Sequence, residues 1–183
     1  MSDEGLEDLV ALAGDPRCVA IGESGLDYYR DRSPRADQER AFRFHIELAR
    51  AVAKPLIIHT RAADDDTIDM LAAHAGDIEV VLHCFSMPDR IAECAARGWW
   101  VSFAGNVTYP RNGELAIAAA AAPAERLLVE TDAPYLTPQA MRKERNEPAF
   151  VVETARFVAE RRGLALEELD VLVTANAARL FGW

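Results

Sequence analysis

Short apolar runs alternate with amphipathic segments along this chain. Five runs rich in β-branched or large apolar residues are bounded by turn residues and predict strands, at 18–21, 55–58, 78–82, 99–103 and 127–129. Between the first two runs, apolar side chains recur every three or four residues over 41–52, which predicts a helix with one buried stripe. Further helical patterns cover about 65–74, 88–97, 114–121, 148–162 and 167–180, with Gly98 and Gly163 as stop signals.

The order of these elements predicts an α/β fold. Strands that alternate with helices form parallel sheets with the helices outside, and continuous apolar strands indicate that both sheet faces are covered. Two architectures remain open on this pattern, a doubly wound open sheet and an incomplete β/α barrel. The segment IGESGLDYY has glycines at Gly22 and Gly25 but matches no phosphate-binding loop. A nucleotide-binding sheet is therefore the weaker alternative.

Polar side chains of metal-ligand type follow four of the five predicted strands. They are Glu23, His59, His83 and Asp132, separated by 36, 24 and 49 residues. Each gap is long enough for a helical crossover, so we expect these side chains to meet at the carboxyl rim of a sheet or barrel. Taken singly, such a histidine is more often a hydrogen-bonded core residue and such a carboxylate a helix cap or an ion-pair partner. Together, two imidazoles and two carboxylates predict a site for Zn, Mn or Mg.

Composition and charge narrow the class of protein. The 183 residues are 50% hydrophobic and 27% charged, which is typical of one soluble globular domain. The longest apolar run, 115–122, is far shorter than the roughly 18 residues of a membrane span. The acidic N-terminal segment resembles no secretory leader, and three cysteines without CxxC spacing suit reduced thiols, so we expect a cytoplasmic protein. The net charge of −10 argues against a broad nucleic-acid-binding surface, so a polyanionic substrate would need local cations.

Candidate substrate contacts lie close to these ligands in the sequence. Arg61 follows His59 by two residues and could clamp a phosphate, with a salt bridge to the acidic segment 64–66 as the alternative. Arg145 belongs to the local basic cluster 142–145, which could hold a nucleic-acid backbone or simply be solvated. Phe85 and Tyr135 could stack on a base or pack in the core.

Five ordered sequence blocks resemble the TatD family of metal-dependent hydrolases, whose best-known members are deoxyribonucleases. The blocks are AIGESGLDYY, PLIIHTRAADDDTIDML, VVLHCFSM, LLVETDAPYLTP and RNEPAFV. This resemblance implies a TIM-type β/α barrel, a two-metal centre and phosphodiester hydrolysis, often of single-stranded DNA from the 3′ end. By the same resemblance, Glu23 matches a bridging carboxylate, and His59 and His83 match ligands of the second metal. Asp132 matches a first-metal ligand that also orients or deprotonates the attacking water, so Asp132 and Glu23 are the expected catalytic residues.

One feature of that family is missing from this sequence. Members open with a strand that ends in an H-x-H pair, and no such pair occurs in these 183 residues. The chain therefore looks like strands four to eight of a partial TIM-type barrel, a single domain over 1–183 without the N-terminal βα units. We expect a fragment or a misassigned start codon rather than a naturally short protein. A barrel without its first strands would expose apolar sheet edges through which copies could self-associate.

Three functional hypotheses follow. The first is a TatD-type deoxyribonuclease in which Glu23, His59 and His83 hold one metal ion tightly, while a second ion binds weakly or not at all. The second is a related barrel hydrolase that acts on a small ester, amide or phosphoester. The third, motivated by the missing H-x-H pair, is a catalytically silent metal-binding domain. No membrane partner is expected under any of the three.

Overall fold

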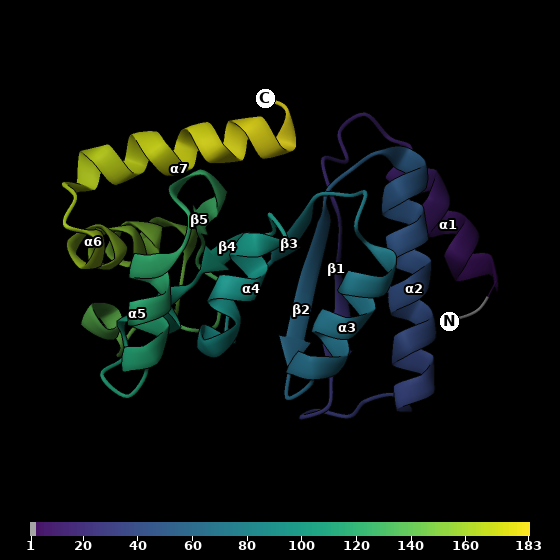
Figure 1. Cartoon of the computed structure of the whole chain (residues 1–183), viewed down its shortest axis with the longest axis horizontal. Coiled ribbons are helices and arrows are strands. Elements are labelled where there is room, and N and C mark those ends of the chain that lie inside the picture. Colours follow the sequence, from purple (N-terminus) through teal and green to yellow (C-terminus); the bar gives the residue numbers. More distant parts are fainter. Residues whose placement is uncertain (1–2) are drawn as a thin grey trace. The chain divides into compact units, whose positions relative to one another are not determined.

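The computed structural model describes residues 3–183, whose strands and helices alternate along the chain (Figure 1). The strands are β1 (Ile21–Asp27), β2 (Leu56–Arg61), β3 (Val80–Leu82), β4 (Trp100–Phe103) and β5 (Leu127–Val129). The α-helices are α1 (Asp3–Ala13), α2 (Arg35–Val52), α3 (Asp64–His74), α4 (Ile91–Ala96), α5 (Gly113–Ala121), α6 (Val151–Arg162) and α7 (Leu166–Phe181). The strands form one sheet in the order β1-β2-β3-β4-β5. The predicted α/β class with five parallel strands and surrounding helices is confirmed.

The chain divides into two compact units. The first holds the chain up to Leu82 together with Leu180–Gly182, and the second holds His83–Arg179 together with Trp183. Strands β1 to β3 belong to the first unit, and β4 and β5 belong to the second. In the described range 3–183, no helix is long and apolar enough to cross a membrane.

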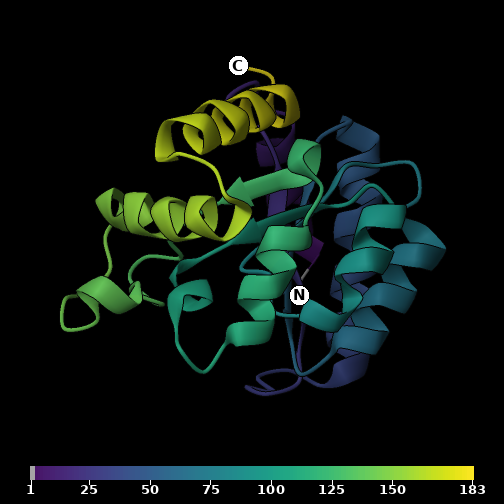
Figure 2. The same ribbon diagram turned by 60° about the vertical axis from the view of Figure 1, so that its left-hand side comes forward.

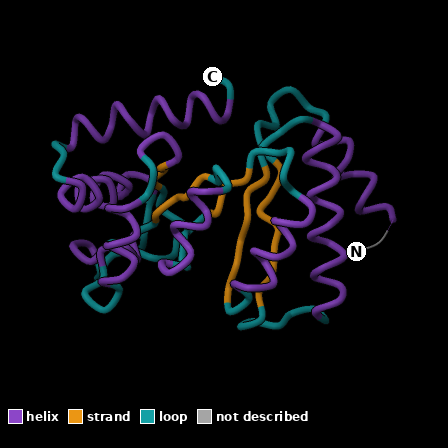
Figure 3. Tube along the Cα trace, in the orientation of Figure 1, coloured by secondary structure: helices purple, strands orange, loops and turns teal. Residues whose placement is uncertain are grey.

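In the first unit, β2 is paired in parallel with β1 on one side and with β3 on the other. Helix α2 packs mainly on β1, and Figure 3 shows α2 and α3 running beside the strands of this unit. The apolar stripe predicted from the sequence is confirmed, since α2 buries Phe42, Ile46, Leu48 and Ala49. Burial of these side chains is the main stabilising contribution to this layer, at about 1.5–3 kcal/mol for each large apolar side chain.

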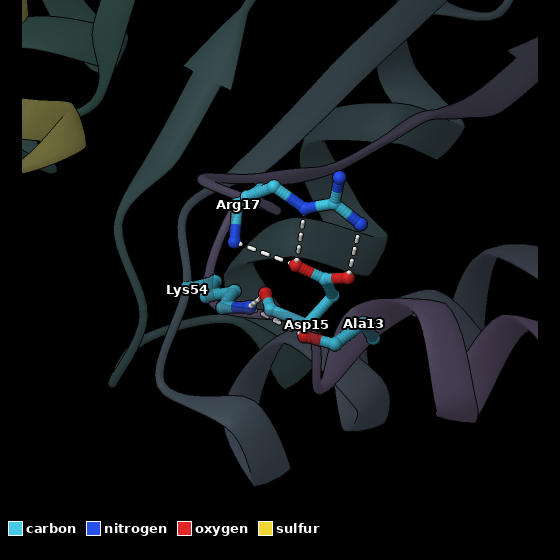
Figure 4. Close-up of polar contacts among 4 residues, drawn as sticks. All are labelled: Ala13, Asp15, Arg17 and Lys54. Carbon is cyan, nitrogen blue, oxygen red and sulfur yellow. Dashed lines mark hydrogen bonds and ion pairs between the residues drawn. The ribbon is translucent and has the colours of Figure 1, made fainter.

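Helix α1, which the hydrophobic pattern did not predict, is tied to its unit by polar contacts. Figure 4 shows the ammonium of Lys54, just after α2, donating hydrogen bonds to the backbone carbonyls of Ala13 and Asp15. Arg17 donates from its guanidinium and its backbone N–H to the Asp15 carboxylate. These hydrogen bonds hold the pKa of the Asp15 carboxyl below its usual value. The turn after α1 is therefore fixed to the segment between α2 and β2.

In the second unit, β4 pairs in parallel with β5, and α5 packs against α6 (Figure 2). Trp100 and Phe103 of β4 are almost completely buried, as is Val158 of α6. The guanidinium of Arg162 donates hydrogen bonds to the carbonyls of Ala119 and Ala122, at the end of α5. Arg162 thereby supplies donors to carbonyls that a helix end leaves without intrahelical partners.

Candidate metal centre

The first ligand candidate, Glu23, lies within a strand. The sequence predicted a strand at 18–21 with Glu23 following it, but β1 begins at Ile21 and continues to Asp27, so that boundary was wrong. Gly22 and Gly25 both adopt a φ of 145°, a conformation that side-chain-bearing residues rarely adopt. In the sequence these glycines suggest a turn, but in the structure the irregular strand β1 requires them, because only glycine adopts this φ readily.

These two glycines leave no room for a side chain between β1 and β2. A Cβ atom added to Gly25 would lie 1.9 Å from the carbonyl oxygen of His59, and one added to Gly22 would lie 2.7 Å from that of Ile57. Gly25 is the strand partner of His59 in the β1–β2 register. Main-chain packing on both sides of Glu23 therefore sets its position relative to β2.

The second candidate, His59, is half-buried near the end of β2, within the strand rather than after it as predicted. Its Nε2 atom lies 3.5 Å from the Oδ2 atom of Asp27. The other oxygen of Asp27 accepts hydrogen bonds from the backbone N–H groups of Tyr29 and Arg30, at 3.0 and 2.8 Å. Burial raises the pKa of Asp27, but these N–H groups and the nearby His59 outweigh it, so the net shift is downward. The Asp27 carboxylate, held by these N–H groups, therefore lies beside the His59 ring.

The third candidate, His83, directly follows β3, as predicted. Leu82, the last residue of β3, is the strand partner of Ile58, which precedes His59. The register of the first unit thus brings the two histidine positions to the ends of neighbouring strands. Glu23, His59 and His83 each offer one ligand atom, and these atoms lie within 4.8 Å of one another.

This donor set fits a divalent cation. Two imidazoles and one carboxylate are ligands that Zn and Mn accept, and catalytic zinc sites often have this composition with one position open. Ligand atoms bound to one tetrahedral zinc lie about 3.4 Å apart, given bonds of roughly 2.1 Å. The three ligand atoms lie within 4.8 Å of one another, so their separations exceed this spacing by at most about 1.4 Å. The expected metal site is thus supported for Glu23, His59 and His83.

A further residue at this site, Glu130, was missed by the sequence analysis. It directly follows β5, and its Oε1 atom lies 2.9 Å from Nδ1 of His83. The same oxygen accepts a hydrogen bond from the backbone N–H of Cys84 at 3.1 Å. The sequence does hold a sign of this residue, because the run LLVETD at the end of a predicted strand has two carboxylates, Glu130 and Asp132. The first carboxylate after the strand contacts the histidine, and the second is Asp132.

The fourth candidate, Asp132, stands on a tight turn after β5, with a φ of 54°. Its carbonyl oxygen accepts a hydrogen bond from the N–H of Tyr135 at 2.8 Å. The side-chain amide of Asn146 donates to the carbonyls of Thr131 and Tyr135, on either side of Asp132. The turn that carries Asp132 is therefore held within its own unit, while its role toward metal or water stays a prediction.

The expected substrate residues have different surroundings. Arg61 is exposed at the end of β2, with its Cζ atom 3.9 Å from the ring centroid of Tyr29. Tyr135 is 65% exposed, and Arg145 is also exposed. Phe85 is only 1% exposed and packs edge to face on Phe103 at 5.6 Å between ring centroids. This corrects the expectation for Phe85, whose ring lies in the core of its unit, where no base could stack on it.

Comparison with known proteins shows a whole-chain similarity. The family model described as TatD related DNase matches residues 1–182. An uncharacterized metal-dependent hydrolase TatD from Mycobacterium tuberculosis is 41% identical over 189 residues, covering 100% of this chain and 71% of that protein. A 3′-5′ ssDNA/RNA exonuclease TatD from Cronobacter turicensis is 41% identical over 187 residues, covering 98% of this chain and 71% of that protein. The crystal structure of YjjV, a TatD homolog from Escherichia coli K12, superposes with a TM-score of 0.91 at 26% identity, covering 100% of this chain and 72% of that one.

Proposed function

The chain belongs to the TatD related DNase family, and on that basis we propose that it is a metal-dependent hydrolase that cleaves DNA phosphodiester bonds, from single-stranded 3′ ends. The observation that carries this proposal is the group formed by Glu23, His59 and His83, with ligand atoms within 4.8 Å of one another. A relative named as a 3′-5′ ssDNA/RNA exonuclease supports the substrate class.

In this proposal, one group of residues binds the metal ion and another residue acts on the attacking water. Glu23, His59 and His83 hold one divalent ion tightly, and two imidazoles favour Zn or Mn over Mg. Such an ion, when bound, makes water more acidic and polarises a phosphoryl oxygen. Asp132, on a turn that Asn146 restrains on both sides, orients the attacking water or accepts its proton.

The nucleic-acid strand is proposed to bind at exposed cations and one exposed ring. Arg142 lies 4.5 Å and Arg111 lies 5.9 Å from the ring centroid of Tyr109, measured from the guanidinium carbon. Arg145 extends this local basic cluster in a chain whose net charge is −10. Tyr135, 65% exposed, offers a ring on which a base can stack. Arg61 is the proposed phosphate contact on β2.

The test uses a 5′-labelled single-stranded oligodeoxynucleotide with Mn, and a parallel panel of small esters. We expect the wild-type chain to shorten the oligonucleotide from its 3′ end. Asp132→Asn should lower turnover about a hundredfold or more, because the proton acceptor is lost. Isothermal titration should still find one tight ion in that variant, whereas His59→Ala should lose it.

His74→Gln is the matched control, because His74 ends α3 and lies outside the ligand group. Its metal affinity and turnover should equal those of the wild type. Release of no nucleotides, together with turnover of a small ester, would overturn the assignment of DNA as substrate. Two equally tight ions would contradict the single-site proposal.

A further inference from the structure

The backbone of Glu130 is hydrogen-bonded within its own unit, independently of the contacts that its carboxylate makes. Its backbone N–H donates to the carbonyl of Phe103, the last residue of β4, at 3.0 Å. The side chain of Glu130 is 23% exposed and that of His83 is 14% exposed. A contact between partly buried groups on a fixed backbone restricts the orientation of both side chains more than a surface pair does.

The chemistry of this contact assigns the proton on His83. A carboxylate can only accept hydrogen bonds, so the 2.9 Å contact between Glu130 and His83 requires the proton on Nδ1 of the ring. A neutral ring protonated at Nδ1 has its lone pair at Nε2. A metal ion can bind His83 only through such a lone pair.

We infer that Glu130 is a positioning residue that fixes the tautomer and the ring orientation of His83, so that Nε2 is the atom presented to the metal. This inference rests on the proposed metal site and goes beyond it, because it concerns a residue outside the ligand group. Carboxylates in this position orient metal-bound histidines and increase their basicity.

The same carboxylate oxygen also holds the backbone beyond His83. It accepts the N–H of Cys84 at 3.1 Å, and Cys84 has a φ of 47°, in the left-handed region that residues with a side chain rarely adopt. One oxygen atom therefore fixes both the ring of His83 and the turn that follows it. Loss of Glu130 should release both.

The first measurement is made on the metal-free, ¹⁵N-labelled chain at pH 8. Long-range ¹H–¹⁵N spectra should show His83 protonated at Nδ1 in the wild type. Glu130→Ala should shift His83 to a mixture of tautomers or to the Nε2-protonated form. Glu130→Gln keeps an oxygen acceptor at the same distance along the side chain, so it should retain part of the Nδ1-protonated form.

The second measurement is isothermal titration of the same three chains with Zn. Glu130→Ala should bind Zn about 10- to 100-fold more weakly than the wild type, with Glu130→Gln between them. His74→Gln should bind as the wild type does. Because Glu130→Gln is close in size and shape to the native side chain, it keeps the comparison informative if Glu130→Ala does not fold.

The outcomes separate the two proposals. A wild-type His83 protonated at Nε2, or equal tautomers and equal Zn affinities in all three chains, would overturn the role of Glu130. A wild type with the expected tautomer but without Zn binding would overturn the proposed metal site while leaving the Glu130–His83 contact intact.

Discussion

Two regions of the molecule position their candidate site residues by different physical means. In the β1–β2 pair, Glu23 and His59 lie inside strands, and close main-chain contact at Gly25 sets their places. In the second unit, His83 and Asp132 lie on segments that follow strands. The Glu130 carboxylate accepts a hydrogen bond from His83, and the Asn146 amide donates to the carbonyls on either side of Asp132. Adding a methyl group at Gly25 should therefore displace Glu23 and His59. Removing a hydrogen-bonding side chain should displace His83 or Asp132.

The largest expected effect comes from Gly25→Ala. The added Cβ would lie 1.9 Å from the carbonyl oxygen of His59, so β1 and β2 must separate. Overpacking and the φ of 145° together should lower the free energy of unfolding by about 3 kcal/mol or more. Urea denaturation measures this loss, and Zn titration should show a matching loss of affinity.

Gly76→Ala is the control for this variant. Apart from its two chain neighbours, no residue has a heavy atom within 4 Å of a Cβ built at Gly76, so the free energy of unfolding should change by less than about 0.5 kcal/mol. If Gly25→Ala were as stable as Gly76→Ala, main-chain contact would not be what positions His59.

A smaller effect is expected for Asn146→Ala in the second unit. Asn146 is 4% exposed, and its loss leaves the carbonyls of Thr131 and Tyr135 without their amide donor. The free energy of unfolding should fall by about 2 kcal/mol. Amide hydrogen exchange over 131–136 should become faster, since the turn that carries Asp132 loses its restraint.

Asn112→Ala provides the comparison in the same unit, because its amide donates to the carbonyl of Asn106 and not to a carbonyl of this turn. Exchange over 131–136 should stay at the wild-type rate in that variant. Equal exchange in both variants would mean that Asn146 does not hold the Asp132 turn.

The smallest effect on stability is expected for Asp77→Asn, which removes a side-chain contact between α2 and the segment that follows α3. Arg50 donates to both carboxylate oxygens of Asp77 and lowers the pKa of that group. A carboxyl with a lowered folded-state pKa stabilises the protein above its unfolded pKa, near 3.9, and that contribution is lost as the pH falls through the folded value. The melting temperature of Asp77→Asn should therefore lie below that of the wild type at pH 7.

Thermal melts of both chains at several pH values check this sign. The gap between wild type and Asp77→Asn should shrink as the pH falls below about 4. Zn affinity at pH 7 should be the same in both chains. A gap that widened in acid would contradict the direction of the Asp77 shift.

Much of the fold follows from local patterns in the sequence. The later strands and the helices on each side of them were predicted within a few residues, because apolar runs and helical stripes both report burial. His83 stands where the sequence placed it, directly after β3. Metal-ligand residue types near successive strand ends predicted that Glu23, His59, His83 and Asp132 would meet. The ligand atoms of the first three lie within 4.8 Å of one another, and the place of Asp132 beside them stays a prediction.

What the sequence could not supply depends on contacts between distant segments. The continuation of β1 beyond Ile21 was missed because GESG resembles a turn, and only the backbone of β2 explains why Gly22 and Gly25 belong in a strand. Glu130 was missed because its partner, His83, is 47 residues away in the chain. For Phe85 the sequence left both base stacking and core packing open, and only its burial against Phe103 decides for packing.

The contact at Gly25 limits which substitutions this protein can accept during evolution. Its nearest neighbour is a peptide carbonyl, which every amino acid at position 59 would present, so no replacement of that neighbour creates space. A selection for suppressors of Gly25→Ala should therefore recover glycine itself. Substitutions that change the metal affinity of the site therefore have to occur at other positions. Glu130 is one such position, because it contacts the proposed ligand His83 and is not a ligand itself.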